Sequence, residues 1–307
     1  MLRVISLSTD DNNLVKNFEK TAQYFGYEYY FVGRGKSFQG WPWRTNLYIS
    51  AIERLGKDPK DIFILCDSND LFFVAPSDEM KEKFINSNKN CLIGAEAACC
   101  NGKYGDRKFR NEALESCKKR NPNTRYMFPN GGFLIGYRDE LLKLLNSNKT
   151  EWDDQGGYLQ KFMDKSPLLD INISQSLVGN VPTINEWYHV PGDEYGKPEI
   201  TYWNYSEENN RFKNIFSGEY PCAFHFPGKS YSPYNIVTSK MFSVEPGNPN
   251  TILLPYNPQT SILLKSTLSK EQNQTLLIFL IIIAVLILAV GVTVLTLVLL
   301  KRSKFNK

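Results

Sequence analysis

Two carboxylates three residues apart give this sequence its strongest chemical signal. Asp67 and Asp70 directly follow the apolar run at 62–66, which is typical of a buried strand. Carboxylate oxygens are the ligands that hard cations such as Mg²⁺, Mn²⁺ and Ca²⁺ prefer. Two like charges so close also repel each other unless a cation lies between them. The segment therefore predicts a metal site, with a polar β-turn as the alternative explanation.

His225 is the second candidate, and it is one of only two histidines in the chain. Its neighbours are apolar, and Gly228 and Lys229 follow it, two residue types that suit a phosphate group. Glycine lets the backbone approach a ligand closely, and lysine supplies a positive charge. The alternative is a histidine packed in the core. His189 lacks such a context and is expected to be structural.

Two further segments carry polar groups where elements begin. Asp153 and Asp154 open a predicted helix, where acids would also stabilise the helix by capping it and opposing its dipole. Asn130 precedes two glycines in a turn before a strand. Those glycines would let the backbone approach a ligand, or would simply form a tight turn.

The first 230 residues alternate apolar runs with segments of helical periodicity. This order predicts an α/β fold with a mainly parallel sheet and helices on both faces. In such sheets a ligand binds beyond the carboxyl ends of the strands, which is where Asp67 and Asp70 would lie. The predicted strands are 3–8, 27–32, 61–67, 90–95, 131–137 and 222–226, and the predicted helices are 13–24, 45–55, 77–86, 139–146 and 153–163.

The carboxyl-terminal part has a different composition. Residues 233–275 are rich in Pro, Asn and Ser, as expected of a stalk. Residues 276–300 are 25 consecutive residues without a charge, long enough at ~1.5 Å per residue to cross a hydrocarbon core of ~30 Å. The sequence therefore predicts a folded domain at 1–232, the stalk, one transmembrane helix and a basic tail at 301–307.

The charge balance argues against nucleic acid as a partner. The formal net charge is +4, and the tail 301–307 holds four basic residues and no acid, which leaves 32 basic and 32 acidic residues elsewhere. A protein that binds nucleic acid without sequence preference needs a basic surface to displace counterions, and no net excess supplies one here.

Two membrane orientations are compatible with the sequence. The first residues contain no apolar stretch typical of a signal peptide, which favours insertion after synthesis with the domain in the cytosol. The basic tail favours the opposite orientation by the positive-inside rule, and only then would the Asn-x-Ser/Thr sequons be usable. We expect a single-pass protein of a secretory-pathway (ER or Golgi) or viral membrane.

Seven stretches, spread over residues 3 to 232, share their order with one family. The sequence resembles the glycosyltransferase domain of the multifunctional procollagen lysyl hydroxylases and related collagen glycosyltransferases of cellular and giant-virus origin. The stretches are VISLSTDD, IFILCDSNDLFF, CLIGAEAACC, FPNGGFLIGYRDELLKLL, WDDQGGYLQKF, LLDINISQSLVGNV and FHFPGKS.

The resemblance implies a GT-A fold, a Rossmann-like α/β sandwich. It also implies Mn²⁺-dependent, retaining transfer from UDP-galactose or UDP-glucose to hydroxylysine or galactosyl-hydroxylysine of a collagen-like protein. By the same resemblance Asp67, Asp70 and His225 hold the manganese. Gly228 and Lys229 would meet the diphosphate of the donor.

Other positions match the family less directly. Thr9 matches a contact to uridine, Asn130 lines the sugar pocket, and Asp153 and Asp154 lie where the family places acids needed for transfer. The family commonly has an aromatic residue between its two metal acids, but this sequence has Asn69.

Because Asn69 cannot stack on uracil, another residue would have to hold the base. Trp41 or Trp43 is the candidate, unless both are ordinary packing residues. Arg44 lies near a basic residue of the family, although the match is loose there.

Other functions would also fit parts of the pattern. The chain could transfer sugar to other surface glycans or glycoproteins, or it could be a non-catalytic, membrane-anchored carbohydrate-binding protein with a GT-A-like fold. A calcium-dependent adhesion module would need more acids near residue 67 than the sequence contains.

Overall fold

The computed structural model describes residues 1–99, 107–120, 124–147, 154–164, 166, 168–181, 188–189, 199–228 and 231–254. Met1–Leu254 form one compact unit. The predicted transmembrane helix and basic tail lie outside the described residues. Within the described ranges, no helix is both long and apolar enough to cross a membrane.

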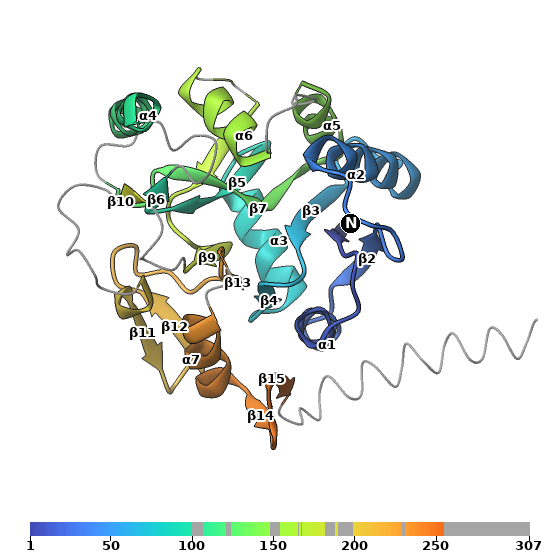
Figure 1. Cartoon of the computed structure of the whole chain (residues 1–307), viewed down its shortest axis with the longest axis vertical. Coiled ribbons are helices and arrows are strands. Elements are labelled where there is room, and N and C mark those ends of the chain that lie inside the picture. The colour runs from blue at the N-terminus through green and yellow to red at the C-terminus, as the bar shows by residue number, and fades with distance from the viewer. Residues whose placement is uncertain are drawn as a thin grey trace, which may run out of the picture. The chain divides into compact units, whose positions relative to one another are not determined.

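A six-stranded sheet forms the centre of the compact unit (Figure 1). Its strand order is β2-β1-β3-β7-β5-β8. The pairs β1–β2, β1–β3 and β5–β8 are parallel, whereas β7 is antiparallel to both β3 and β5. The strands are β1 (Leu2–Leu7), β2 (Glu28–Val32), β3 (Ile62–Asp67), β5 (Cys91–Glu96), β7 (Phe128–Tyr137) and β8 (Asp170–Asn172). The prediction of an α/β fold with a mainly parallel sheet is confirmed.

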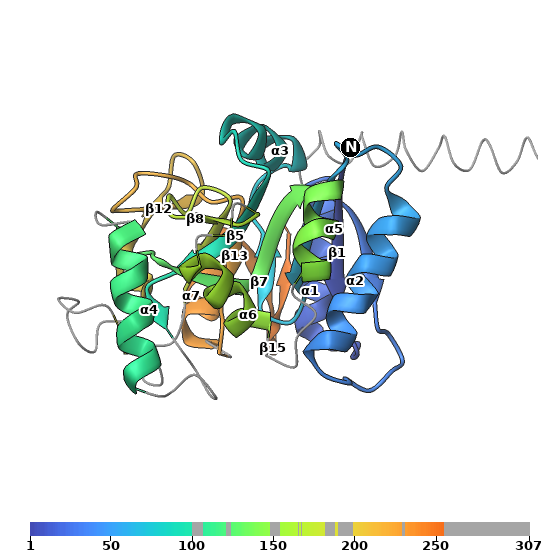
Figure 2. The ribbon, with the colours of Figure 1, turned by 90° about the horizontal axis from the view of Figure 1, so that it is seen from above.

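Helices cover both faces of the sheet, and the strand β3 explains why. Successive side chains of a strand point to opposite faces of the sheet. Phe63 and Leu65 pack in one buried cluster with apolar residues of α2, α5 and α6. Ile62 and Ile64 pack on the opposite face with apolar residues of α1 and α3. Figure 2 shows α2 and α5 side by side. The helices are α1 (Asn13–Tyr24), α2 (Trp41–Leu55), α3 (Ser77–Asn86), α4 (Arg107–Arg120), α5 (Arg138–Ser147) and α6 (Asp154–Met163).

A second, three-stranded sheet lies at the carboxyl end of β3. Its order is β4-β13-β9, with β4 (Leu71–Phe73), β13 (Ala223–His225) and β9 (Val178–Asn180). β13 is antiparallel to β4 and parallel to β9. This small sheet joins three segments that are more than 40 residues apart in the chain.

Shorter elements complete the unit. They are the strand pairs β6 (Ala98–Cys99) with β10 (Tyr188–His189) and β11 (Trp203–Ser206) with β12 (Arg211–Asn214), and the 3₁₀ helix Glu199–Tyr202. Helix α7 (Tyr231–Met241) and the antiparallel strands β14 (Ser243–Glu245) and β15 (Asn248–Leu253) follow.

The segment from 233 to 254 differs from the predicted stalk. It folds as most of α7 and the β14–β15 pair, and its apolar residues Val237, Met241 and Ile252 are buried in a third core cluster. The composition, rich in Pro and Asn, predicted a linker. The apolar side chains of this segment nevertheless pack against the rest of the compact unit in the third core cluster. Residues 255–275 lie outside the described residues.

Asn17 of α1 ties β15 and α7 to the sheet domain. Its side chain is fully buried and donates to the hydroxyl of Tyr234 at 2.8 Å and to the carbonyl of Asn250. It also accepts from the backbone N–H of Ile252 at 3.0 Å. One amide thus satisfies three groups that burial removes from water.

We predict that Asn17→Ala destabilises the chain by about 1–3 kcal/mol, because it leaves buried partners without a hydrogen bond. Urea unfolding followed by circular dichroism measures the change. Asn46→Ala, at an exposed position of α2, is the matched control and should change stability little. Equal stability of the two variants would contradict this role for Asn17.

Candidate metal centre

The turn between β3 and β4 presents the two predicted carboxylates. Asp67 is the last residue of β3, and Asp70 immediately precedes β4. Ser68 donates to the carbonyl of Leu7 at 3.0 Å, and Asn69 accepts from the side chain of Asn12 at 2.9 Å. Both contacts tie the turn to the end of β1 and the start of α1.

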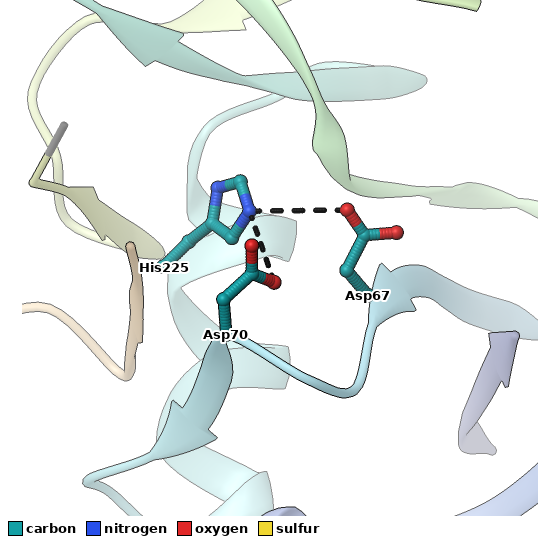
Figure 3. A group of neighbouring side chains, drawn as sticks. All are labelled: Asp67, Asp70 and His225. Atoms are coloured by element: carbon teal, nitrogen blue, oxygen red, sulfur yellow. Dashed lines mark ion pairs between the residues drawn. The ribbon is translucent and has the colours of Figure 1, made fainter. Parts of the chain in front are cut away.

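His225 reaches the same point from the small sheet. It is the last residue of β13 and is the register partner of Leu71, the residue after Asp70. Its Nε2 lies 3.5 Å from Oδ1 of Asp70 and 3.9 Å from Oδ2 of Asp67 (Figure 3). One ligand atom from each residue lies within 4.8 Å of the other two. The structure therefore brings the three sequence-predicted metal ligands together.

Two of these ligand atoms lack hydrogen bonds. Oδ1 of Asp70 and Nε2 of His225 are buried, and neither has a hydrogen-bond partner within the described residues. Buried polar atoms are nearly always satisfied, so an orphaned pair facing a common point indicates a missing ligand. Two carboxylates and an imidazole suit a divalent cation such as Mn²⁺. The residues present fit the expected metal.

The electrostatics of the group favour a cation in the same way. Burial raises the pKa of Asp67, and the nearby Asp70 raises it further, while Arg44 and His225 act against this. Burial alone lowers the pKa of His225, but the carboxylates of Asp70 and Asp67 outweigh that effect and raise it above its ordinary value. Both shifts reflect negative charge concentrated out of water, which a divalent ion would compensate.

Arg44 binds a metal ligand. Its buried guanidinium donates to Oδ1 of Asp67 at 2.6 Å and to the carbonyl of Gly131 at 3.2 Å. The side chain orients Asp67, because it takes up Oδ1 of the carboxylate and leaves Oδ2 toward His225. A role of Arg44 in binding the donor stays a prediction.

Gly132 makes room for the histidine. A Cβ atom at this position would lie only 2.2 Å from Cε1 of His225. Asn130, which is also buried, accepts from the N–H of Gly132 at 2.8 Å. The sequence predicted a turn here, but residues 130–132 lie inside β7, where its pairing with β5 shifts register between Ile93 and Gly94. Of the two glycines at 131–132, Gly132 therefore allows the close approach of the imidazole.

The family model described as the PLOD GT domain matches residues 1–181 of this chain. The chain belongs to this family. The resemblance to the glycosyltransferase domain of the lysyl hydroxylases is thereby confirmed.

Curated relatives agree with the family. Procollagen-lysine,2-oxoglutarate 5-dioxygenase 1 of Rattus norvegicus is 28% identical over 188 residues, which are 56% of this chain and 24% of that protein. An uncharacterized protein of Acanthamoeba polyphaga mimivirus is 26% identical over 178 residues, 54% of this chain and 36% of that protein. The chain thus spans about a quarter to a third of the length of these relatives.

Among solved structures, mouse xyloside xylosyltransferase 1 in its apo form is similar to this chain. The TM-score is 0.40 at 12% sequence identity, covering 74% of this chain and 98% of that one.

Five further residues were predicted to bind the donor or to act in transfer, and the structure describes three of them. Thr9 is half-buried in the segment between β1 and α1, and Gly228 is exposed with a positive φ of 76°. Asp154 is the first residue of α6. Asp153 and Lys229 lie outside the described residues. The roles of these five in donor binding and transfer stay predictions.

Trp41 and Trp43 belong to an aromatic cluster near Arg44. Phe38 makes edge contacts with both rings, at centroid distances of 5.2 and 6.0 Å, and is itself 48% exposed. The guanidinium of Arg44 lies 4.8 Å from the ring centre of Trp41. Through Arg44, this cluster is linked to Asp67.

The sequence analysis missed two buried polar residues of the centre. Glu96, the last residue of β5, is fully buried, and its charge helps to raise the pKa of His225. Asn180 hydrogen-bonds to Nδ1 of His225 at 2.8 Å. Glu96 ends an apolar run as Asp67 does, which is a signal that could have identified it. Asn180 had no such signal.

We predict that Mn²⁺ stabilises the chain less as the pH falls. Binding needs an unprotonated imidazole, and the pKa of His225 lies above its ordinary 6.5, so protons compete already above that pH. Without the cation, the contribution of His225 to folding stability has the opposite pH dependence. The carboxylates stabilise the protonated ring, so this contribution is fully present below pH 6.5 and is lost as the pH rises through the raised pKa of His225.

The measurement is the rise in Tm caused by Mn²⁺ across a series of pH values. His225→Gln should remove the pH dependence above pH 6.5, and His189→Gln, which changes the other histidine, should retain it. An unchanged pH dependence in His225→Gln would refute the assignment.

Proposed function

We propose that this chain is a Mn²⁺-dependent, retaining glycosyltransferase that moves galactose or glucose from a UDP-sugar to an acceptor. The observation that carries the proposal is the convergence of Asp67, Asp70 and His225 at the carboxyl end of β3, with two buried ligand atoms left unsatisfied. Membership in a glycosyltransferase-domain family supports the reaction class.

The chain's residues would hold the diphosphate end of the donor. Mn²⁺, when bound, would offset the negative charge that builds on the leaving diphosphate as the glycosidic bond breaks. Asp67 and Asp70 supply carboxylate ligands, and Arg44 keeps Asp67 oriented. Because these groups are fixed before the reaction, they can stabilise the transition state without reorganising. Lys229 would add positive charge at the same phosphates.

The acceptor side rests on the relatives and on the family resemblance. The curated relatives include procollagen-lysine dioxygenases, so we propose hydroxylysine or galactosyl-hydroxylysine of a collagen-like protein as acceptor. Asp153 and Asp154 would face the donor sugar and the acceptor hydroxyl, and Asn130 would line the sugar pocket. We also propose that residues 276–300 attach the enzyme to a secretory-pathway or viral membrane.

The uracil base would be held by the aromatic cluster of Phe38, Trp41 and Trp43. Stacking of one base on an aromatic side chain is worth about 1–3 kcal/mol. We therefore predict that Trp41→Ala or Trp43→Ala weakens UDP binding about 5- to 150-fold in the presence of Mn²⁺. Calorimetric titration with UDP measures this. Phe216→Ala, which removes an aromatic residue that is 56% exposed elsewhere, should bind normally, and normal binding by both tryptophan variants would exclude the cluster.

The reaction itself is tested by UDP release from UDP-galactose and UDP-glucose, with Mn²⁺ or with EDTA. We predict release from at least one donor, its loss in EDTA, and a decrease of about 100-fold or more in Asp70→Asn, in keeping with the removal of one preorganised electrostatic group. Asp78→Asn, which changes an exposed acid of α3, is the matched control and should keep its activity.

Two outcomes would contradict the proposal. Release that survives both EDTA and Asp70→Asn would place the reaction at another site. Folded, Mn²⁺-loaded chain that neither binds nor hydrolyses any nucleotide sugar would favour a non-catalytic carbohydrate-binding protein.

A further inference from the structure

A buried amide network lies behind the metal centre, on the side of His225 away from the carboxylates. Asn180 and His225 are register partners on the parallel strands β9 and β13, and Oδ1 of Asn180 lies 2.8 Å from Nδ1 of His225. Both side chains are almost completely buried. In Figure 3 the second ring nitrogen of His225 faces away from Asp67 and Asp70.

A backbone carbonyl fixes the orientation of the Asn180 amide. Its Nδ2 donates to the carbonyl oxygen of Ala95 at 2.9 Å. A carbonyl can only accept, so the nitrogen end must face Ala95 and the oxygen end must face His225. The amide oxygen is also only an acceptor. The proton of a neutral His225 ring must therefore be on Nδ1, which leaves the lone pair on Nε2, the atom that faces the two carboxylates.

Gln175 bonds both to the backbone of Asn180 and to the carbonyl that Asn180 contacts. Its Oε1 accepts from the backbone N–H of Asn180 at 2.9 Å, and its Nε2 donates to the same carbonyl of Ala95 at 2.7 Å. Gln175 is fully buried and has a positive φ of 57°, a conformation that non-glycine residues rarely adopt. Gly94 leaves space for the network, since a Cβ there would lie 2.9 Å from Nδ2 of Asn180.

We propose that Asn180 is a positioning residue that selects the Nδ1–H tautomer of His225 and so presents Nε2 to the cation. The inference rests on the proposed metal site. Histidines that bind metals commonly donate their other ring N–H to such a partner, and the loss of the partner typically costs 10- to 100-fold in metal affinity. Because Asn180 is uncharged, it orients the ring without adding a negative charge beside Glu96 and the two aspartates.

The tautomer can be observed without any metal. The chain contains only two histidines, so ¹⁵N-histidine labelling gives two imidazole spin systems, and His189→Gln assigns them. At alkaline pH, where the ring is neutral, His225 should show a protonated Nδ1 and an unprotonated Nε2. The opposite tautomer, or a mixture of the two, in the wild-type chain would overturn the proposal, whatever the variants do.

Metal affinity tests whether Asn180 acts through His225. We expect Asn180→Ala to weaken Mn²⁺ binding about 10- to 100-fold, measured by electron paramagnetic resonance of free Mn²⁺. In a His225→Ala background the same change should cause no further loss. Asn180→Asp keeps an acceptor for Nδ1–H but loses the donor to Ala95, so its affinity should be intermediate.

Asn172→Ala is the matched control. Asn172 is also buried, and its amide faces the backbone of Leu177 and Val178 rather than the histidine. It should bind Mn²⁺ with wild-type affinity. Equal losses from Asn180→Ala with and without His225 would show a merely structural role and overturn the inference. Failure of the wild-type chain to bind Mn²⁺ while showing the Nδ1–H tautomer would overturn instead the metal site on which it rests.

Discussion

The repulsion between Asp67 and Asp70 is the constraint on which the rest of the site depends. The turn after β3 brings two half-buried carboxylates together, and such an arrangement is unfavourable unless positive charge compensates it. Arg44 neutralises one oxygen of Asp67. Oδ2 of Asp67 and Oδ1 of Asp70 face Nε2 of His225, and the latter two atoms are buried without a hydrogen-bond partner within the described residues. The charges and the donor atoms of the centre therefore suit a divalent cation.

The second, three-stranded sheet brings the residues of the site together. β3 ends at Asp67 and belongs to the central sheet, whereas β4, β9 and β13 belong to the small one. Pairing of β13 with β4 fixes His225 opposite Leu71, and pairing with β9 puts Asn180 behind the imidazole. Backbone hydrogen bonds thus fix where the ligands lie, including the bond from the N–H of Phe226 to the carbonyl of Asp70 at 2.8 Å.

The sequence predicted the parts of this centre that have a local signature. The apolar run of β3 ending at acids predicted a metal site at Asp67 and Asp70, and the family resemblance added His225; the structure brings the three residues together. The contact of Arg44 with Asp67 and the network of Asn180 were not predictable in this way, because they depend on which strands become neighbours. The same holds for the segment from α7 to β15, where five buried apolar residues pack in the third core cluster despite a linker-like composition.

The position of the bound metal ion can be determined directly. Crystals of the chain grown with Mn²⁺ and UDP, with diffraction data collected at the manganese absorption edge, would locate the ion by its anomalous signal. We expect one strong peak bounded by Asp67, Asp70 and Nε2 of His225, with Nδ1 still bonded to Asn180. A peak at another place in the compact unit, or none in crystals that contain bound UDP, would contradict it.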